Sequence, residues 1–264
     1  SWYQPMQCYA LLKKVFRTIL EEAEIKPNKI TYYCENRDPD FDQKMHNVLL
    51  VYKQLSLQFD ENGQLLPFPE DEQVTHVLSY DEKPGIQAIA NTTEDLPPDE
   101  NHKTISRDYE YKRLGTVSLL AGIDLQTGEA IPLVRDRHSS KEYIEFLQLL
   151  DSKYPKEDKI RLVLDNLQVH TSQETRKYLA GVPGRFEFVF TPKHGSWLNL
   201  VEGFFSKLTR QSLKGIRVKT KSELVERIYK YFEEINATPV VYHWKYRLDE
   251  INPNEEAQVE TLSL

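Results

Sequence analysis

The chain has 264 residues, of which 39% are hydrophobic and 28% charged, and its formal net charge is −7. This composition is that of a globular protein with one sizeable core and excludes a low-complexity chain. No stretch approaches the 18 apolar residues of a membrane-spanning helix and no signal peptide is visible, so we expect a cytoplasmic protein without membrane contact. Only Cys8 and Cys34 are present, which argues against a disulfide framework or a zinc site.

Residues 1–72 are predicted to hold a short helical segment and a linker. Residues 8–25 place apolar side chains at helical spacing. The polar stretch KPNKITYYCENRDPDFDQ indicates a linker. A second helix is expected through FDQKMHNVLLVYKQLSLQF, with Asp40 as its cap.

Residues 73–248 have the pattern of a mixed α/β domain. Strands are expected at VTHVLSYDEK, KIRLVLDN and RFEFVFTP, and a hairpin at RLGTVSLLAGIDLQTGEAIPLV. Helices are expected at SSKEYIEFLQLLDSKY, SQETRKYLAG, SWLNLVEGFFSKLTRQSL and KSELVERIYKYFEEIN, the last with Ser222 as its N-cap. A hairpin followed by alternating helices and strands predicts a mixed sheet covered by helices.

Charge is distributed unevenly along the chain. Residues 249–264 carry five acids and no Lys or Arg, and we expect this acidic tail to be disordered. From Lys193 to Lys230, nine Lys or Arg stand against three Glu. The net charge alone argues against nucleic-acid binding, but this local basic stretch allows it.

Three carboxylates are candidates for one site. Asp81 and Asp165 are each expected to close a strand, and Glu202 lies at the edge of the apolar stripe of a helix. Ligands bind beyond the carboxyl ends of strands in open α/β sheets, so the three could converge there. Unpaired carboxylates close together raise one another's pKa, and Mg²⁺ or Mn²⁺ would remove that penalty.

Each carboxylate also has a structural alternative. Asp165 precedes Asn166 after a strand, where such residues often form turns or caps. Asp81 lies in the turn-like sequence YDEKPG, and Glu82 is an equally plausible ligand. Glu202 could instead pair with a basic neighbour.

The segments SYDEKPGIQAI, LVLDNLQVHTS and TPKHGSWLNLVEGFFSKLTRQSL closely resemble the catalytic domain of mariner-like insertion-sequence transposases. The resemblance covers about residues 70–250. It implies the DDE superfamily and a ribonuclease H-like fold, a five-stranded mixed sheet flanked by helices. It also implies that Asp81, Asp165 and Glu202 are the catalytic, metal-binding triad; the 36 residues between Asp165 and Glu202 are close to the usual spacing.

The resemblance implies DNA strand cleavage and strand transfer by two-metal phosphoryl transfer, with two Mg²⁺ or Mn²⁺ ions. The implied partners are transposon ends and target DNA, typically at TA, bound by a homodimer near the nucleoid. Family members usually carry two helix-turn-helix units first, whereas only residues 8–25 form a clear helix here. A ribonuclease H-like nuclease without strand transfer, or a domesticated DNA-binding relic, therefore stays an alternative.

Further residues are assigned supporting roles. Asn199, three residues before Glu202, could orient that carboxylate by a hydrogen bond. Trp197 is expected in the core, with stacking on an extruded base as the alternative. Arg210 and Lys214 are expected to share a helical face. The residues predicted to surround the triad are Asn166, His170 and Asn199, and those predicted to contact DNA are Lys193, His194, Arg210, Lys214 and Arg217.

Overall fold

The structure is a computed structural model that describes residues 38–69 and 73–262. Arg37–Leu264 form one compact unit, and α2 therefore belongs to the same unit as the sheet. The helix predicted over residues 8–25 and both cysteines lie outside the described residues.

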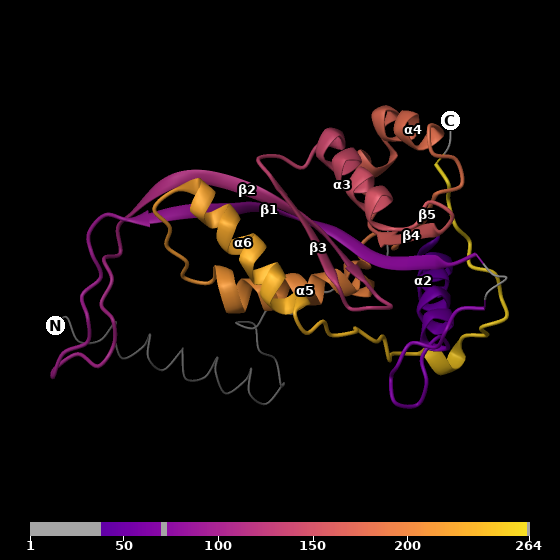
Figure 1. The fold of residues 1–264 in the computed structure, drawn as a ribbon, viewed down its shortest axis with the longest axis horizontal. Helices are drawn as coiled ribbons and strands as arrows, with labels where there is room; N and C mark the ends of the chain where they lie inside the picture. The colour runs from indigo at the N-terminus through magenta and orange to yellow at the C-terminus, as the bar shows by residue number, and fades with distance from the viewer. Residues whose placement is uncertain (1–37, 70–72, 263–264) are drawn as a thin grey trace, which may run out of the picture. The chain divides into compact units, whose positions relative to one another are not determined.

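A mixed five-stranded sheet forms the centre of this unit, as predicted (Figure 1). Its strands lie in the order β3-β2-β1-β4-β5. The neighbours β1/β2 and β2/β3 are antiparallel, whereas β1/β4 and β4/β5 are parallel. The strands are β1 (Thr75–Asn91), β2 (Tyr111–Asp124), β3 (Ala130–Arg135), β4 (Lys159–Leu164) and β5 (Phe186–Phe190).

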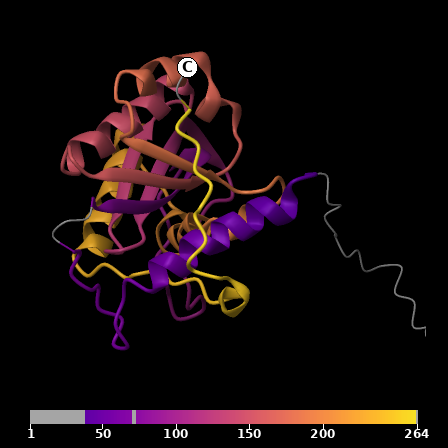
Figure 2. The same ribbon diagram turned by 90° about the vertical axis from the view of Figure 1, so that its right-hand side faces the viewer.

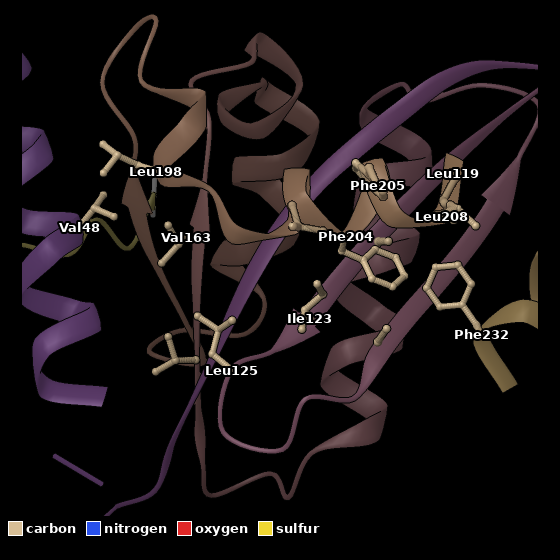
Figure 3. Packing of buried hydrophobic residues seen from close by; sticks show 14 of the residues in the cluster. Val48, Leu119, Ile123, Leu125, Val163, Leu198, Phe204, Phe205, Leu208 and Phe232 are labelled. Carbon is tan, nitrogen blue, oxygen red and sulfur yellow. The ribbon is translucent and has the colours of Figure 1, made fainter. Parts of the chain in front are cut away.

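Helices cover both faces of the sheet (Figures 1 and 2). They are α2 (Phe41–Ser56), α3 (Ser140–Lys153), α4 (Gln173–Ala180), α5 (Leu200–Leu208) and α6 (Lys221–Asn236). Side chains of α2, α5 and α6 share one buried cluster with one face of the sheet, and those of α3 and α4 share a second cluster with the other face. Figure 3 shows the first cluster, in which Phe204 of α5 and Phe232 of α6 pack near Ile123 of β2. Burial of these apolar faces fixes each helix against the sheet.

Strand β1 is longer than predicted. It does not end at its acids but continues to Asn91. The Pro84-Gly85 pair, expected to form a turn, instead lies where the β1/β2 register shifts between Lys83 and Ile86, and Gly85 has φ of 67°. A β-bulge with glycine in the left-handed region accounts for both features, and it lets the strand bend without ending.

Beyond this bulge, β1 and β2 form a two-stranded arm closed by residues 92–110 (Figure 1). Leu96 and Ser106 form a bridge across this loop. Arg107 pairs with Asp95 at 2.7 Å and also donates to the carbonyl of Gly215 at 2.9 Å. The loop is thereby attached to the segment that follows α5.

The helix that carries Glu202 begins later than predicted. Ser196–Leu198 form a 3₁₀ turn, α5 starts at Leu200, and Thr209–Leu213 form a π-helical turn after it. Trp197 therefore does not share the apolar stripe of the helix, and its side chain is 46% exposed; the core placement was wrong. Arg210 lies within the π turn and Lys214 directly follows it with an extended backbone, so the expected shared face of these two residues is not part of an α-helix.

Two end assignments also change. Thr220, not Ser222, caps α6, because its side chain accepts a hydrogen bond from the backbone N–H of Glu223. The tail was expected to be disordered, but Glu260 and Phe188 exchange two backbone hydrogen bonds at 2.8 and 2.9 Å. In the part of the chain that the structure describes, no helix has the length and apolar character to cross a membrane.

Candidate active site

Asp81 and Asp165 occupy equivalent positions on two neighbouring parallel strands. The last paired residues of β1 and β4 are Ser79 and Val163, and each aspartate lies two residues further on. β1 continues past this point only as the partner of β2. The carboxyl ends of the parallel pairing therefore carry both acids side by side, although Asp81 lies within a strand rather than at its end.

Glu202 approaches the same edge from α5. It is half-buried in the first turn of the helix. An open hollow of about 560 Å³ is lined by Asp81 and Glu202, together with Trp197 and Asn199. Two of the three candidate acids thus face one cavity.

The electrostatics of Asp81 connect all three acids. Burial raises the pKa of Asp81, and although the N–H of Glu82 opposes this, the negative charges of Glu82, Asp165 and Glu202 raise it further, to about 7. Such repulsion acts only over short distances in a partly buried site. The arrangement holds unneutralised negative charge around one point.

Asp165 is partly exposed and also shows the turn geometry of the structural alternative. Its side chain is 45% exposed, and Oδ1 accepts a hydrogen bond from the backbone N–H of Leu167 at 3.1 Å. The other carboxylate oxygen is not used by that turn. The Asx turn therefore fixes the orientation of the carboxylate without occupying it.

Asn199 holds α5 against β1. Its side-chain amide donates to the carbonyl of Tyr80 at 2.8 Å and its Oδ1 accepts from the hydroxyl of Ser79. The same hydroxyl accepts from the backbone N–H of Val201 at 2.9 Å. Both polar side chains are almost fully buried. Asn199 was predicted to hydrogen-bond Glu202 through its side chain; it instead bonds the N–H of Glu202 through its carbonyl at 3.1 Å and fixes the helix that carries it.

Residues 77–225 match the family of DDE superfamily endonucleases. This match covers more than half of the chain. The chain belongs to this family.

The chain is 25% identical over 206 residues to the insertion element IS630 uncharacterized 39 kDa protein of Shigella sonnei, across 77% of this chain and 53% of that protein. The chain thus spans about half the length of that curated relative.

Solved structures support the fold. The Mos1 mariner paired end complex with Mn matches 83% of this chain and 63% of that chain, with a TM-score of 0.52 and 12% identity. The mariner Mos1 paired end complex with Mg matches 92% and 80%, with a TM-score of 0.50 and 12% identity. Together with the family match, these similarities confirm the predicted ribonuclease H-like fold and the resemblance to mariner-like insertion-sequence transposases.

Within this DDE fold, Glu82 points away from Asp81. Successive residues of a strand face opposite sides of the sheet, so Asp81 faces α5 whereas Glu82 lies with Tyr80 on the α3 side. The side chain of Glu82 is 5% exposed. Its Oε1 accepts from the hydroxyl of Tyr80 at 2.7 Å and from Nε2 of His170 at 3.0 Å. Although Glu82 also borders the hollow, the alternation of the strand favours Asp81 as the acid that faces α5.

His170 links Glu82 to Asp165. Its Nδ1 lies 2.9 Å from the backbone carbonyl of Asp165, and its side chain is fully buried. Burial lowers the pKa of His170, but the hydrogen bond and charge of Glu82 and those of Asp165 outweigh it and raise the pKa overall. Because both ring nitrogens face oxygen acceptors, both donate, and the imidazolium pairs with Glu82.

This pairing also decides how a nearby cluster is interpreted. Ligand atoms of Glu82, Asp165 and His170 lie within 4.8 Å of one another, as in a metal site. An imidazole that donates from both nitrogens has no lone pair for a metal. We therefore interpret the cluster as a hydrogen-bonded network that holds the backbone of Asp165 in place. Asn166, the third residue expected around the triad, donates to the carbonyl of Thr191 at 3.3 Å and so ties the ends of β4 and β5 together.

The predicted DNA contacts fall into two groups, one at each end of α5. Lys193 and His194 are exposed before the helix, and Lys193 is tied by its N–H to Asp38 at 2.9 Å. Arg210 and Lys214 are exposed after it. The helix between them rises about 13 Å, so no single phosphate joins the groups.

Arg217 differs from the other basic residues of the second group. Its guanidinium lies 5.9 Å from the centre of the Tyr111 ring and its Nη1 donates to the carbonyl of Ile216 at 3.1 Å. The side chain is half-buried. A role in stabilising the outer end of the β1–β2 arm, where Tyr111 pairs with Asn91, accounts for these contacts, and the contact of Arg217 with DNA stays a prediction.

Sequence reasoning missed Ser79 and Tyr80 as parts of this site and considered Glu82 only as an alternative ligand. The alternation of VLSYDE contained the necessary signal, because it assigns Ser79 and Asp81 to one face and Tyr80 and Glu82 to the other. Only the tertiary structure supplies the partners, since Asn199 and His170 lie 120 and 88 residues away from the residues they contact.

Proposed function

We propose that this chain is the catalytic part of a transposase that cleaves DNA strands with divalent metal ions held by Asp81, Asp165 and Glu202. The observation that carries the proposal is the equivalent placement of Asp81 and Asp165 at the end of the parallel pairing, with Glu202 across the hollow. Membership of the DDE endonucleases supports it.

The donor set suits Mg²⁺ or Mn²⁺. All three side chains offer carboxylate oxygens, which these hard cations prefer. Burial raises the pKa of Asp81 and the negative charges of Glu82, Asp165 and Glu202 raise it further, and a dication bound between the acids would remove the repulsive part of this penalty. Two ions, as the resemblance implies, would supply Lewis-acid activation of the attacking oxygen and stabilisation of the leaving oxygen.

The chain's own residues would position this chemistry. The Ser79–Asn199 contact fixes the distance between the strand and the helix that carry Asp81 and Glu202. His170 holds the backbone of Asp165 in place through the hydrogen bond from its Nδ1 to the carbonyl of Asp165. Exposed cations at the two ends of α5 would contact phosphates of the DNA on either side of the hollow.

We extend the proposal to strand transfer. A 3′-OH freed by cleavage would attack target DNA, at TA sites if the mariner resemblance extends to the target. Assembly as a homodimer on paired transposon ends belongs to the same proposal. The Mos1 mariner paired end complexes with Mn and with Mg support it by analogy of fold.

Asp165→Asn tests the proposal. It removes a charge but keeps the shape and the acceptor for the N–H of Leu167, so the fold should persist while strand cleavage is lost by at least a hundredfold, about 3 kcal/mol. Nicking of labelled duplex in Mn²⁺ is the assay, and exposed Asp99→Asn is the matched control. Undiminished nicking by Asp165→Asn would refute the assignment, and nicking without joining would favour a nuclease that lacks strand transfer.

A further inference from the structure

Trp197 is an exposed aromatic at the wall of the candidate active site. Its side chain is 46% exposed and lines the same hollow as Asp81 and Glu202. Exposing this much of a large aromatic to water is unfavourable unless something covers it. The hollow therefore combines three features: acids, room for a ligand and one accessible aromatic surface.

Two other aromatic residues support Trp197 from behind. The ring of Trp197 lies 5.9 Å from that of Trp244, which in turn stacks on Tyr52 at 5.6 Å. Tyr52 is buried and its hydroxyl donates to the carbonyl of Leu198 at 2.6 Å. The row of three rings extends from the core to the hollow.

The chain before Trp197 is equally constrained. At Gly195 a Cβ would lie 2.6 Å from Cγ of Pro192, so the backbone folds tightly against the proline. Leu198, directly after Trp197, is fully buried, and Figure 3 shows it beside Val48 of α2 and Val163 of β4. Trp197 is therefore held between two fixed points, so it loses little freedom when a ligand covers it.

We infer that Trp197 is the platform on which an unpaired DNA base next to the scissile phosphate stacks. This inference rests on the proposed function, because a phosphodiester held by the acids brings the adjoining nucleotide to the wall of the hollow. Bases within a duplex already have both faces covered, so the ligand is an unstacked base. Stacking on an aromatic ring tolerates any base sequence.

The test compares two oligonucleotides of the same charge, a 12-mer of thymidine and a 12-mer of abasic deoxyribose. The full chain carries Asp165→Asn so that no strand is cut, and Mg²⁺ is present. We expect Trp197→Ala to weaken binding of oligothymidine by roughly 5- to 150-fold and to leave binding of the abasic strand unchanged. Trp197→Phe should retain most of the affinity, because an aromatic face remains.

Tyr246→Ala serves as the control, because Tyr246 is 61% exposed and lies outside the lining of the hollow; it should change neither affinity. Oligothymidine should also quench the intrinsic fluorescence of the Asp165→Asn chain, and Trp197→Phe should remove that part of the quenching. This second readout stays valid even if Trp197→Ala is poorly folded.

The inference is overturned if Trp197→Ala weakens both oligonucleotides equally, or neither, or if the Asp165→Asn chain shows no preference for bases over abasic sugar. The nicking assay on the unaltered chain decides separately on catalysis. If the chain never nicks DNA but Trp197→Ala abolishes its preference for bases over abasic sugar, the base-binding role of Trp197 is supported and the proposed nuclease activity is rejected.

Discussion

Replacing Asn199 by Ala removes the link between the two elements that carry Asp81 and Glu202. The substitution leaves the buried hydroxyl of Ser79 without its acceptor and the carbonyl of Tyr80 without the amide of Asn199. Each unpaired buried group costs about 1–3 kcal/mol. We therefore expect the free energy of unfolding to fall by about 2–6 kcal/mol for the two groups, which leaves a domain in the middle of the ordinary stability range folded at 25 °C.

Urea denaturation measures that loss, and a double-mutant cycle with Ser79→Ala isolates the contact. The coupling between the two substitutions should be about 0.5–3 kcal/mol, because the second removal finds the partner already gone. Exposed Asn101→Ala is the matched control and should stay within about 0.5 kcal/mol of the unaltered chain.

Nicking activity supplies the second readout. If Asn199 sets the distance between strand and helix, Asn199→Ala should lose activity by at least tenfold under conditions where it is fully folded, since small displacements of positioned groups reduce rates strongly. A variant that keeps both its stability and its nicking rate would refute this reasoning, and additive double mutants would refute the contact.

Three further outcomes follow from the geometry. His170→Asn should lower the free energy of unfolding, measured by urea denaturation, by about 3–5 kcal/mol because the charge of Glu82 stays buried without its partner. Adding Glu82→Gln should restore part of the lost stability. A loss below about 1 kcal/mol in His170→Asn would contradict the ion pair. With the pKa of Asp81 raised to about 7, Mn²⁺ affinity measured by calorimetry should rise about tenfold per pH unit up to about pH 7 and level off above it. Without metal, the folded chain holds the proton of Asp81 more tightly than the unfolded chain does. Asp81 therefore makes the free energy of unfolding fall as the pH rises from about 4 to about 7. Replacing both Arg210 and Lys214 by Ala should reduce the steepness of the plot of log affinity for duplex DNA against log salt concentration by about 0.9 per lost phosphate contact. An unchanged slope would mean that neither residue contacts a phosphate.

The order of strands and helices was predictable because the apolar residues of each element recur with a spacing typical of a strand or of a helix. The buried strand KIRLVLDN and the capped helix after Ser139 are examples, and both occur where expected. The resemblance then assigned positions to Asp81, Asp165 and Glu202. None of this required knowledge of contacts between distant residues.

The errors come from places where local sequence allows two structures. Pro84-Gly85 fits either a turn or a bulge, and pairing with β2 decided for the bulge. SWLNL fits the first turn of a helix, but the bonds of Asn199 to β1 hold a 3₁₀ turn and delay α5 to Leu200. Trp197 was misplaced as a consequence, since a helical period was applied to a residue outside the helix.

The adjacent acids of β1 make the site sensitive to the phase of one strand. A deletion of one residue before Ser79 that is absorbed by sliding β1 would still present a carboxylate to the hollow, but it would be that of Glu82, one methylene longer, while Asp81 would take the place of Tyr80 on the α3 side. An insertion absorbed in the same way would instead present Tyr80 to the hollow and place Asp81 beside His170. The bulge at Gly85 confines such a slip to the segment before it, so the β1–β2 arm could keep its own pairing while the catalytic edge is out of phase.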